Sequence, residues 1–224
     1  MISYERLGTK VLPVMVPANY GLETYNFYIV SKSSSLTLID AGMDSEECWN
    51  ALCETLKGGG FLISDLTEIL LTHHHADHIG LVNRILQEQK IPVYAHPLAI
   101  PRMAREKKYM LMRINFFKQL YQEMNGGELG EKQIKAMEKS LHKNDHQKIE
   151  TDIIPLTEGD SILNFLVQEV PGHAQDQIAF NDKDRKWSFV GDHLIQHISS
   201  NALVEPDFDG NRVHTVSQYV QTLE

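Results

Sequence analysis

Five side chains that can bind metal lie within six consecutive positions, in the run His73-His74-His75-Ala76-Asp77-His78. The run follows a short apolar stretch, Glu68 to Thr72, that is typical of a buried strand. Side chains alternate along a strand, so His73 and His75 point the same way and can bind one ion, whereas His74 points elsewhere. Asp77 and His78 follow on the turn into the next helix, within reach of a second ion. Imidazole with carboxylate is the ligand set of zinc, iron or manganese sites.

A purification tag or a group of solvated loop histidines would also give a histidine-rich run. A tag is disfavoured because this run is internal, is interrupted by Ala76 and Asp77, and lies between a strand pattern and an apolar helix pattern. Solvated histidines at a strand exit stay open as the alternative. The clustering of ligand types at ligand spacing favours a metal site.

Two later segments also place ligand-type residues at the ends of predicted strands. His173 follows the run Leu163 to Val170, and Asp192 follows the run Trp187 to Val190. Metal sites take their ligands from several elements, and Gly172 permits a close backbone approach beside His173. We therefore expect His173 to complete the ion held by the His-x-His pair. We expect Asp192 to bridge two ions, because a carboxylate offers two oxygens.

The elements that position these residues alternate between strand and helix patterns. Besides the runs named above, strands are predicted at Val11 to Val16, Tyr25 to Ser31, Leu36 to Asp40, Pro92 to Ala95, Asp152 to Leu156 and Ile178 to Asn181. One helix is predicted over Ser45 to Leu56, and another follows the histidine run, with Ile79, Val82, Ile85 and Leu86 on one face. A last helical stretch covers Thr215 to Glu224.

The pattern changes to purely helical between residues 98 and 150. Apolar and long side chains recur at helical spacing at Met103, Lys107, Met110, Ile114, Phe117, Tyr121 and Met124. After Gly126-Gly127 a second helix carries Ile134, Met137 and Leu141. We predict an inserted helical pair over 98–150, with the core formed by 1–97 and 151–224. This row of side chains at helical spacing is typical of ordinary packing, and its methionines would also suit a lid over an apolar ligand.

Composition narrows the class of protein. The chain has 224 residues and 42% hydrophobic content, enough for one sizeable core. No run approaches the roughly 18 to 20 apolar residues needed to span a bilayer, and the first residues lack the order of a secretory signal. We therefore expect no membrane partner and a cytoplasmic location. Cys48 and Cys53 lie five apart in a predicted helix, which favours reduced thiols over a disulfide.

The charge is unevenly distributed. The formal net charge is −9, yet residues 98–150 hold 11 Lys and Arg against 7 Asp and Glu, leaving 10 against 23 elsewhere. An acidic body makes nucleic acid an unlikely partner. The basic segment would attract an anionic small molecule, although it would equally suit a solvated face. The sequence leaves the oligomeric state open.

The spaced motifs resemble those of the metallo-β-lactamase superfamily of hydrolases, in its glyoxalase II-like or lactonase-like branch. They are Leu38-Ile39-Asp40-Ala41-Gly42, His73-x-His75-x-Asp77-His78, Pro171-Gly172-His173 and Gly191-Asp192. The resemblance spans roughly Tyr25 to Asp192. It implies an α/β fold of the αββα sandwich type, with two divalent ions at one edge between the sheets, zinc foremost and iron or manganese as alternatives.

The resemblance also implies a role for each matching residue. It assigns the first ion to His73, His75 and His173, the second ion to Asp77 and His78, and the bridge to Asp192. Asp40 would support the ligands through hydrogen bonds. Asp77 would be the catalytic side chain that orients a metal-activated hydroxide or relays its proton, a hypothesis that fails if Asp77→Asn keeps full turnover at unchanged metal content.

The sequence departs from the family pattern in two places. Relatives with two metals take one more histidine from a Gly-His pair near the C-terminus, and no such pair follows Gly191. The remaining candidates His193, His197 and His214 lack that context, and His193 suits a surface or supporting role better. We expect the chain to stop before that motif and the second site to be incomplete. The other departure is Ala174-Gln175-Asp176-Gln177, where relatives have a glycine-bearing turn.

The histidines elsewhere are not expected to be functional residues. We expect His96, His142 and His146 at the surface or as lid contacts. The favoured function is a metal-dependent hydrolase of a small ester, thioester or lactone, anionic substrates included. The alternatives are a single-iron sulfur dioxygenase, a phosphodiesterase or nucleic-acid-processing hydrolase, and a non-catalytic binding module. His75 argues against the diiron branch, which has glutamate at that position.

Overall fold

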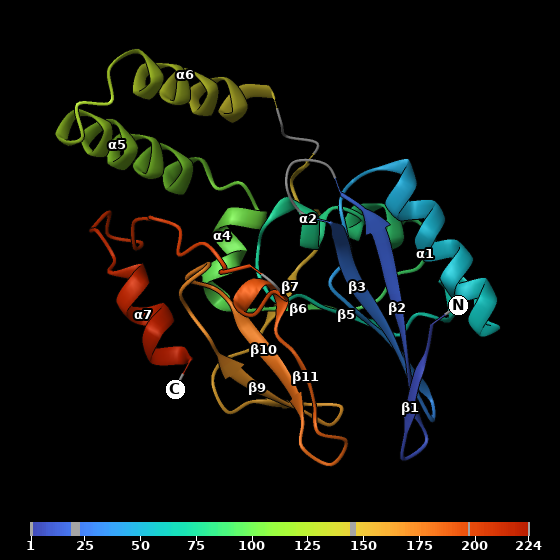
Figure 1. The fold of residues 1–224 in the computed structure, drawn as a ribbon. Coiled ribbons are helices and arrows are strands. Elements are labelled where there is room, and N and C mark those ends of the chain that lie inside the picture. The colour runs from blue at the N-terminus through green and yellow to red at the C-terminus, as the bar shows by residue number, and fades with distance from the viewer. Residues whose placement is uncertain (1, 19–22, 144–146, 197, 224) are drawn as a thin grey trace.

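Two β-sheets stacked face to face form the body of the protein (Figure 1). The computed structural model describes residues 2–18, 23–143, 147–196 and 198–223. The first sheet has the order β1 (Tyr4–Arg6), β2 (Thr9–Pro17), β3 (Thr24–Lys32), β4 (Ser35–Ile39), β5 (Glu68–Leu70), β6 (Val93–Ala95) and β7 (Ile153–Pro155). The second has the order β11 (Trp187–Phe189), β10 (Ile178–Asp182), β9 (Phe165–Glu169) and β8 (Ser161–Ile162).

The pairing of neighbouring strands in the first sheet changes from antiparallel to parallel at β4. Strands β1 to β4 pair antiparallel, and β4 to β7 pair parallel. The second sheet is antiparallel throughout. The strands expected from the sequence are observed with small boundary shifts. The sequence indicated neither β1 nor the two-residue β8, and β9 begins two residues later than predicted because Leu163 lies in the turn between β8 and β9 with a positive φ of 58°.

Alternation along the strands of the first sheet builds two cores. Leu12, Ile29, Leu38 and Ile69 belong to one cluster, which also takes in α1 (Glu46–Gly59) and α3 (Val82–Glu88). Their neighbours Val11, Val30, Ile39 and Leu70 belong to the other, which includes Phe165, Val167, Ile178 and Phe180 of the second sheet. Strands β2 to β5 therefore bury side chains on both faces, as in a helix–sheet–sheet sandwich. The predicted α/β architecture is confirmed.

The helix predicted after the histidine run is broken at Gly80. It divides into α2 (Ala76–Ile79) and α3. The backbone N–H of Gly80 donates to the carbonyl of Gly42 at 2.8 Å, and that of Leu81 donates to Ala41 at 3.1 Å. A Cβ at position 80 would lie 2.1 Å from the nitrogen of Asp44. The loop after β4 thus takes over hydrogen bonds that a continuous helix would make internally.

The helical segment leaves the body after β6 and returns at β7, which is its parallel neighbour. It contains α4 (Ile100–Met103), α5 (Lys107–Glu123) and α6 (Gly127–Lys143), and α5 and α6 project from the sheets as a hairpin (Figure 1). The single predicted row of side chains is wrong at its ends: Met103 lies in α4, and Lys107 and Met124 are exposed. The division of the chain into core and insertion stays a prediction.

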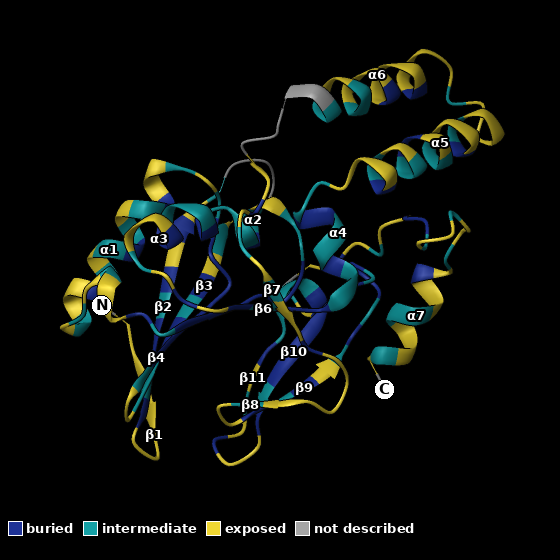
Figure 2. Ribbon diagram, turned by 180° about the vertical axis from the view of Figure 1, so that it is seen from behind, coloured by how far each residue is buried: buried dark blue, intermediate teal, exposed yellow. Residues whose placement is uncertain are grey.

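The last helix, α7 (Thr215–Thr222), packs beside the ends of β9 and β11. Tyr219 donates a hydrogen bond to the carbonyl of His193 at 2.7 Å. Figure 2 shows that β10 is buried along most of its length, while α5 and α6 carry mainly exposed and half-buried residues. In the described part of the chain, no helix has the length and apolar character required to cross a bilayer.

Candidate metal centre

Three loops that follow strands meet at one edge of the sandwich. The loop after β5 carries His73 to His78, the loop after β9 carries His173, and a 3-10 turn after β11, Gly191–His193, carries Asp192. Residues that are about a hundred positions apart in the sequence are thereby brought together. Their ligand atoms form two groups that could each hold a metal ion.

The first, the three-histidine group, consists of His73, His75 and His173. The Nδ1 of His75 lies 2.9 Å from Nε2 of His73 and 2.9 Å from Nε2 of His173. Ligands of a tetrahedral ion with bonds of roughly 2.0 to 2.1 Å are roughly 3.3 Å apart, so the group needs only a small expansion to hold one. The structure therefore brings together the three residues that the sequence assigned to the first ion.

Hydrogen bonds outside the group fix which nitrogen of each ring faces inward. The Thr72 hydroxyl donates its one proton to the Asp40 carboxylate at 2.8 Å, so it accepts from Nδ1 of His73 at 3.1 Å. Likewise Nδ1 of His173 donates to the carbonyl of Asn201 at 2.9 Å. Both rings are left with a lone pair on Nε2 directed at His75. These two lone pairs and Nδ1 of His75 converge on one point, which is an arrangement suited to a cation.

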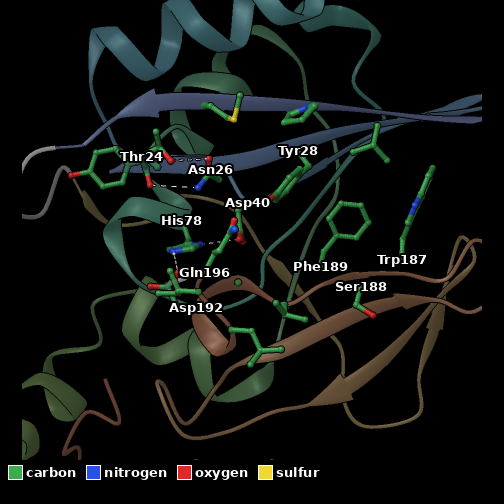
Figure 3. A pocket seen from close by; sticks show the side chains of 18 of the residues that line it. Thr24, Asn26, Tyr28, Asp40, His78, Trp187, Ser188, Phe189, Asp192 and Gln196 are labelled. Atoms are coloured by element: carbon green, nitrogen blue, oxygen red, sulfur yellow. Dashed lines mark hydrogen bonds and ion pairs between the residues drawn. The ribbon is translucent and has the colours of Figure 1, made fainter. Parts of the chain in front are cut away.

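The second, the mixed group, consists of His73, His78 and Asp192. His78 donates from Nδ1 to Asp40 at 2.8 Å, and its Nε2 lies 3.2 Å from Oδ1 of Asp192 (Figure 3). The other oxygen, Oδ2, lies 3.5 Å from Nε2 of His173. Asp192 thus directs one oxygen at each group, which is the geometry of a bridging carboxylate.

The environment lowers the pKa values of the three-histidine group and raises that of His78. Burial, reinforced by neighbouring histidines, lowers the pKa of His75 to about 2 and holds the pKa of His73 well below its usual value. Burial also lowers the pKa of His173. Burial acts the same way on His78, but Asp40 and Asp192 outweigh it and raise its pKa well above the usual value. Neutral imidazoles are the form that binds metal.

Asp77 lies beside the groups without joining either. Its carboxylate is 3.9 Å from Nε2 of His78, and it belongs to neither cluster of ligand atoms. It lines a cleft of about 780 Å³ between the sheets, along with His78 and Asp192. Tyr28, Trp187 and Phe189 also border this cleft (Figure 3). Asp77 can therefore reach a molecule in the cleft.

Several other histidines differ from expectation. His96 is buried rather than at the surface, and its Nε2 lies 3.1 Å from Glu169. A surface role for His193 is wrong, because the ring is buried and contacts Tyr219. His214 is exposed. The predictions for His146 and His197 lie outside the described residues, as does the prediction for the side chain of His142.

Sequence reasoning passed over Thr72 and treated Asp176 only as a departure. Thr72 was the last residue of a predicted strand, and its position directly before the first histidine was the available signal. Asp176 is fully buried and bonds to His74, the histidine that the alternation turned away from the ions. Thr72 bonds to a predicted ligand, and Asp176 bonds to the residue between two predicted ligands, and spacing alone does not reveal such hydrogen bonds.

Comparison with known proteins supports the fold. Residues 20–222 match the model of the metallo-beta-lactamase superfamily. The chain is 32% identical over 197 residues to the probable metallo-hydrolase YqjP of Bacillus subtilis, covering 87% of this chain and 60% of that protein. It is 38% identical over 85 residues to the atrochrysone carboxyl ACP thioesterase nsrC of Aspergillus novofumigatus, covering 37% of this chain and 26% of that protein.

A solved structure shows the same fold. The metallo-beta-lactamase family protein TTHA1429 from Thermus thermophilus superposes with a TM-score of 0.75 at 23% identity, over 96% of this chain and 68% of that one. The chain spans less than two thirds of YqjP. The family match nevertheless covers nearly all of the chain. The chain belongs to the metallo-β-lactamase superfamily.

Proposed function

We propose that this protein is a metal-dependent hydrolase of a small ester or thioester. His73, His75 and His173 would hold one divalent ion, and His78 would hold a second, with Asp192 bridging the two and Asp77 beside the second. The observation that carries the proposal is Asp192, whose two oxygens lie 3.2 Å from His78 and 3.5 Å from His173. A carboxylate between two sets of imidazole nitrogens is suited to bridging two cations.

The nitrogen and oxygen donors fit zinc first, with iron or manganese as alternatives. When bound, divalent ions polarise a carbonyl oxygen and lower the pKa of water toward neutrality. The chain's residues would then orient the substrate and move the proton. Asp77 suits the second task, because it lines the cleft and lies next to His78 without being held by the two groups.

A thioester is the favoured substrate class, with an ester or lactone next. One similar protein is named as an acyl-carrier-protein thioesterase, and the hydrolytic chemistry of esters and thioesters is shared. The helical segment would cover the bound substrate as a lid. Two contacts join α5 to the chain between β11 and α7. They are an ion pair between Arg113 and Glu205 and a ring contact between Tyr109 and Phe208. The helical segment's surplus of basic residues would favour an anionic acyl donor.

The proposal is tested on the full chain by metal analysis and turnover together. We expect purified protein to contain up to two divalent ions per chain and to hydrolyse thioesters in a panel that includes esters, lactones and phosphodiesters. His75→Ala should remove both properties. His214→Ala is the matched control, since His214 is exposed.

Three results would contradict the proposal. One is turnover that survives complete chelation, and another is metal binding without turnover across the whole panel. Bound iron with oxygen consumption in place of hydrolysis would instead favour the dioxygenase alternative.

A further inference from the structure

A fully buried segment, Asp176-Gln177-Ile178, lies between the three ligand-bearing loops. We call it the linking segment. Ile178 donates its backbone N–H to the carbonyl of Thr72 at 2.9 Å, directly before His73. The segment continues from the His173 loop, and the side chains of Asp176 and Gln177 extend to the other two loops. One short stretch of chain therefore contacts every loop of the centre.

Asp176 binds the loop after β5 at two points. Its Oδ2 accepts the backbone N–H of His74 at 2.8 Å, and its Oδ1 lies 2.7 Å from Nδ1 of the same residue. His74 sits between His73 and His75, so fixing its backbone and its ring fixes the register of the His-x-His pair. The carboxylate consequently joins the loop that carries His73 and His75 to the loop that carries His173.

Arg102 of α4 completes this contact. Its Nη1 lies 3.2 Å from Nε2 of His74 and 3.6 Å from Oδ1 of Asp176. The same Nη1 lies 3.3 Å from Nδ1 of His74, so the guanidinium contacts both ring nitrogens about equally. Burial would raise the pKa of Asp176, but His74 and Arg102 outweigh it and hold the pKa below its usual value. The carboxylate stays charged and its hydrogen bonds stay strong.

Gln177 binds the third loop. Its Nε2 donates to the carbonyl of Val190 at 2.9 Å, two residues before Asp192. Gly191 follows with a φ of 51°, and a Cβ there would lie 2.5 Å from the Thr72 hydroxyl and 3.2 Å from Nε2 of Gln177. No side chain fits between the three segments, so their spacing is set by these contacts.

We propose that Asp176 and Gln177 are positioning residues that set the separation of the three ligand loops before an ion binds. Asp176 acts on the three-histidine group through His74, and Gln177 acts on the mixed group through Val190 and Asp192. The inference rests on the proposed function, because it concerns metal ligands. The inference also gives a role to His74, the residue that the alternation of the strand had excluded as a ligand. Partners behind metal ligands typically contribute 10- to 100-fold in affinity.

The test is a stepwise titration of metal-free protein with Zn²⁺ against a chromogenic chelator. For Asp176→Asn we expect the ion of the three-histidine group to bind about tenfold more weakly. His74→Ala should do the same, and the double variant should lose no more than either single one, because one contact is removed. Gln177→Met, close in size, should weaken instead the ion that needs Asp192. Visible spectra of the cobalt-loaded proteins should change with the affected group.

Asp182 provides the matched control, at the opposite end of β10. It is also buried, and it accepts the backbone N–H of Arg185 at 3.0 Å and its guanidinium at 2.9 Å. Asp182→Asn should lower the melting temperature without changing zinc affinity. Melting of each metal-free variant separates lost stability from altered positioning. Should Asp176→Asn not fold, His74→Ala decides, since that ring is partly exposed.

Three negative results would each overturn the inference in a different way. If wild-type protein binds zinc and both Asp176→Asn and His74→Ala bind it equally well, the positioning role is overturned while the proposed function stands. If Asp182→Asn weakens zinc as much as Asp176→Asn does, the effect is general destabilisation and the positioning role is again overturned. If wild-type protein takes up no divalent metal, the proposed function fails and the inference fails with it.

Discussion

The three-histidine group and the mixed group share His73 but are supported by different chemistry. Neutral partners, a hydroxyl and a carbonyl, orient the rings of His73 and His173. Two carboxylates instead flank His78, which they hold as a charged ring. The three-histidine group therefore offers free lone pairs at neutral pH. The mixed group must exchange a proton for an ion, so we expect the three-histidine group to fill first and to bind more tightly.

Removing a ligand from each group gives the largest expected effect. His75→Ala should abolish the tighter ion and lower kcat/KM by more than roughly 100-fold, because even supporting residues contribute 10- to 100-fold. Asp192→Asn should leave the tighter ion in place and remove the weaker one, reducing the metal content from two ions to one. Elemental analysis after desalting, paired with kinetics, measures both. If Asp192→Asn lost all its metal while His75→Ala retained one ion, the three-histidine group would not be the tighter site.

Asp77 tests whether a residue outside both groups does chemistry. Asp77→Asn keeps the size of the side chain but removes its capacity to take a proton, and general acid–base groups typically contribute 10²- to 10⁴-fold. We expect kcat to fall about 100-fold with little change in the tighter ion. A rate equal to wild type at equal metal content would exclude the proton-relay role.

Much of the centre was predictable because its ligands follow strands, whose period of two fixes which side chains converge. His73 and His75 at that spacing, with His173 and Asp192 after later strands, are brought together as the sequence indicated. Alternation likewise predicted the strands that contribute to the two cores. These features depend on local pattern, which one sequence contains.

The rest depends on contacts between distant segments. The helix breaks at Gly80 because the loop after β4 passes within bonding distance, and nothing in the apolar pattern of that helix signals it. A surface position or lid contact was predicted for His96 and a surface or supporting role for His193, yet both rings are buried. The role of Asp176 requires knowing that His74 faces it across about a hundred residues of sequence.

Substitutions of the residues that orient the histidine rings should have smaller effects, each on the affinity of one ion. Thr72→Val removes the hydroxyl that accepts from His73 and should weaken the tighter ion about tenfold. Asp40→Asn loosens His78, and we expect it to weaken mainly the second ion, again about tenfold. Stepwise zinc titration resolves the two affinities. Equal losses at both steps in both variants would mean that Asp40, Thr72 and the two rings behave as one unit.

The stability of metal-free protein should depend on pH in opposite senses for the two groups. The lowered pKa values of His73 and His75 mean that the unfolded chain binds more protons below pH 6.5, so stability falls as pH drops from 6.5 toward about 2. The raised pKa of His78 contributes stability that is present below 6.5 and is lost as pH rises through that higher value. Urea unfolding of chelator-treated protein from pH 5.5 to 9 measures both slopes.

Variants assign each slope to its group. His75→Gln should flatten the acid side, since one half-buried neutral ring is gone, and leave the alkaline side unchanged. Asp192→Asn should flatten the alkaline side, because His78 loses one of the two carboxylates that raise its pKa. If both substitutions altered the same side, the two groups would titrate as one coupled cluster, and the difference between neutral and charged support would not control the order in which the ions bind.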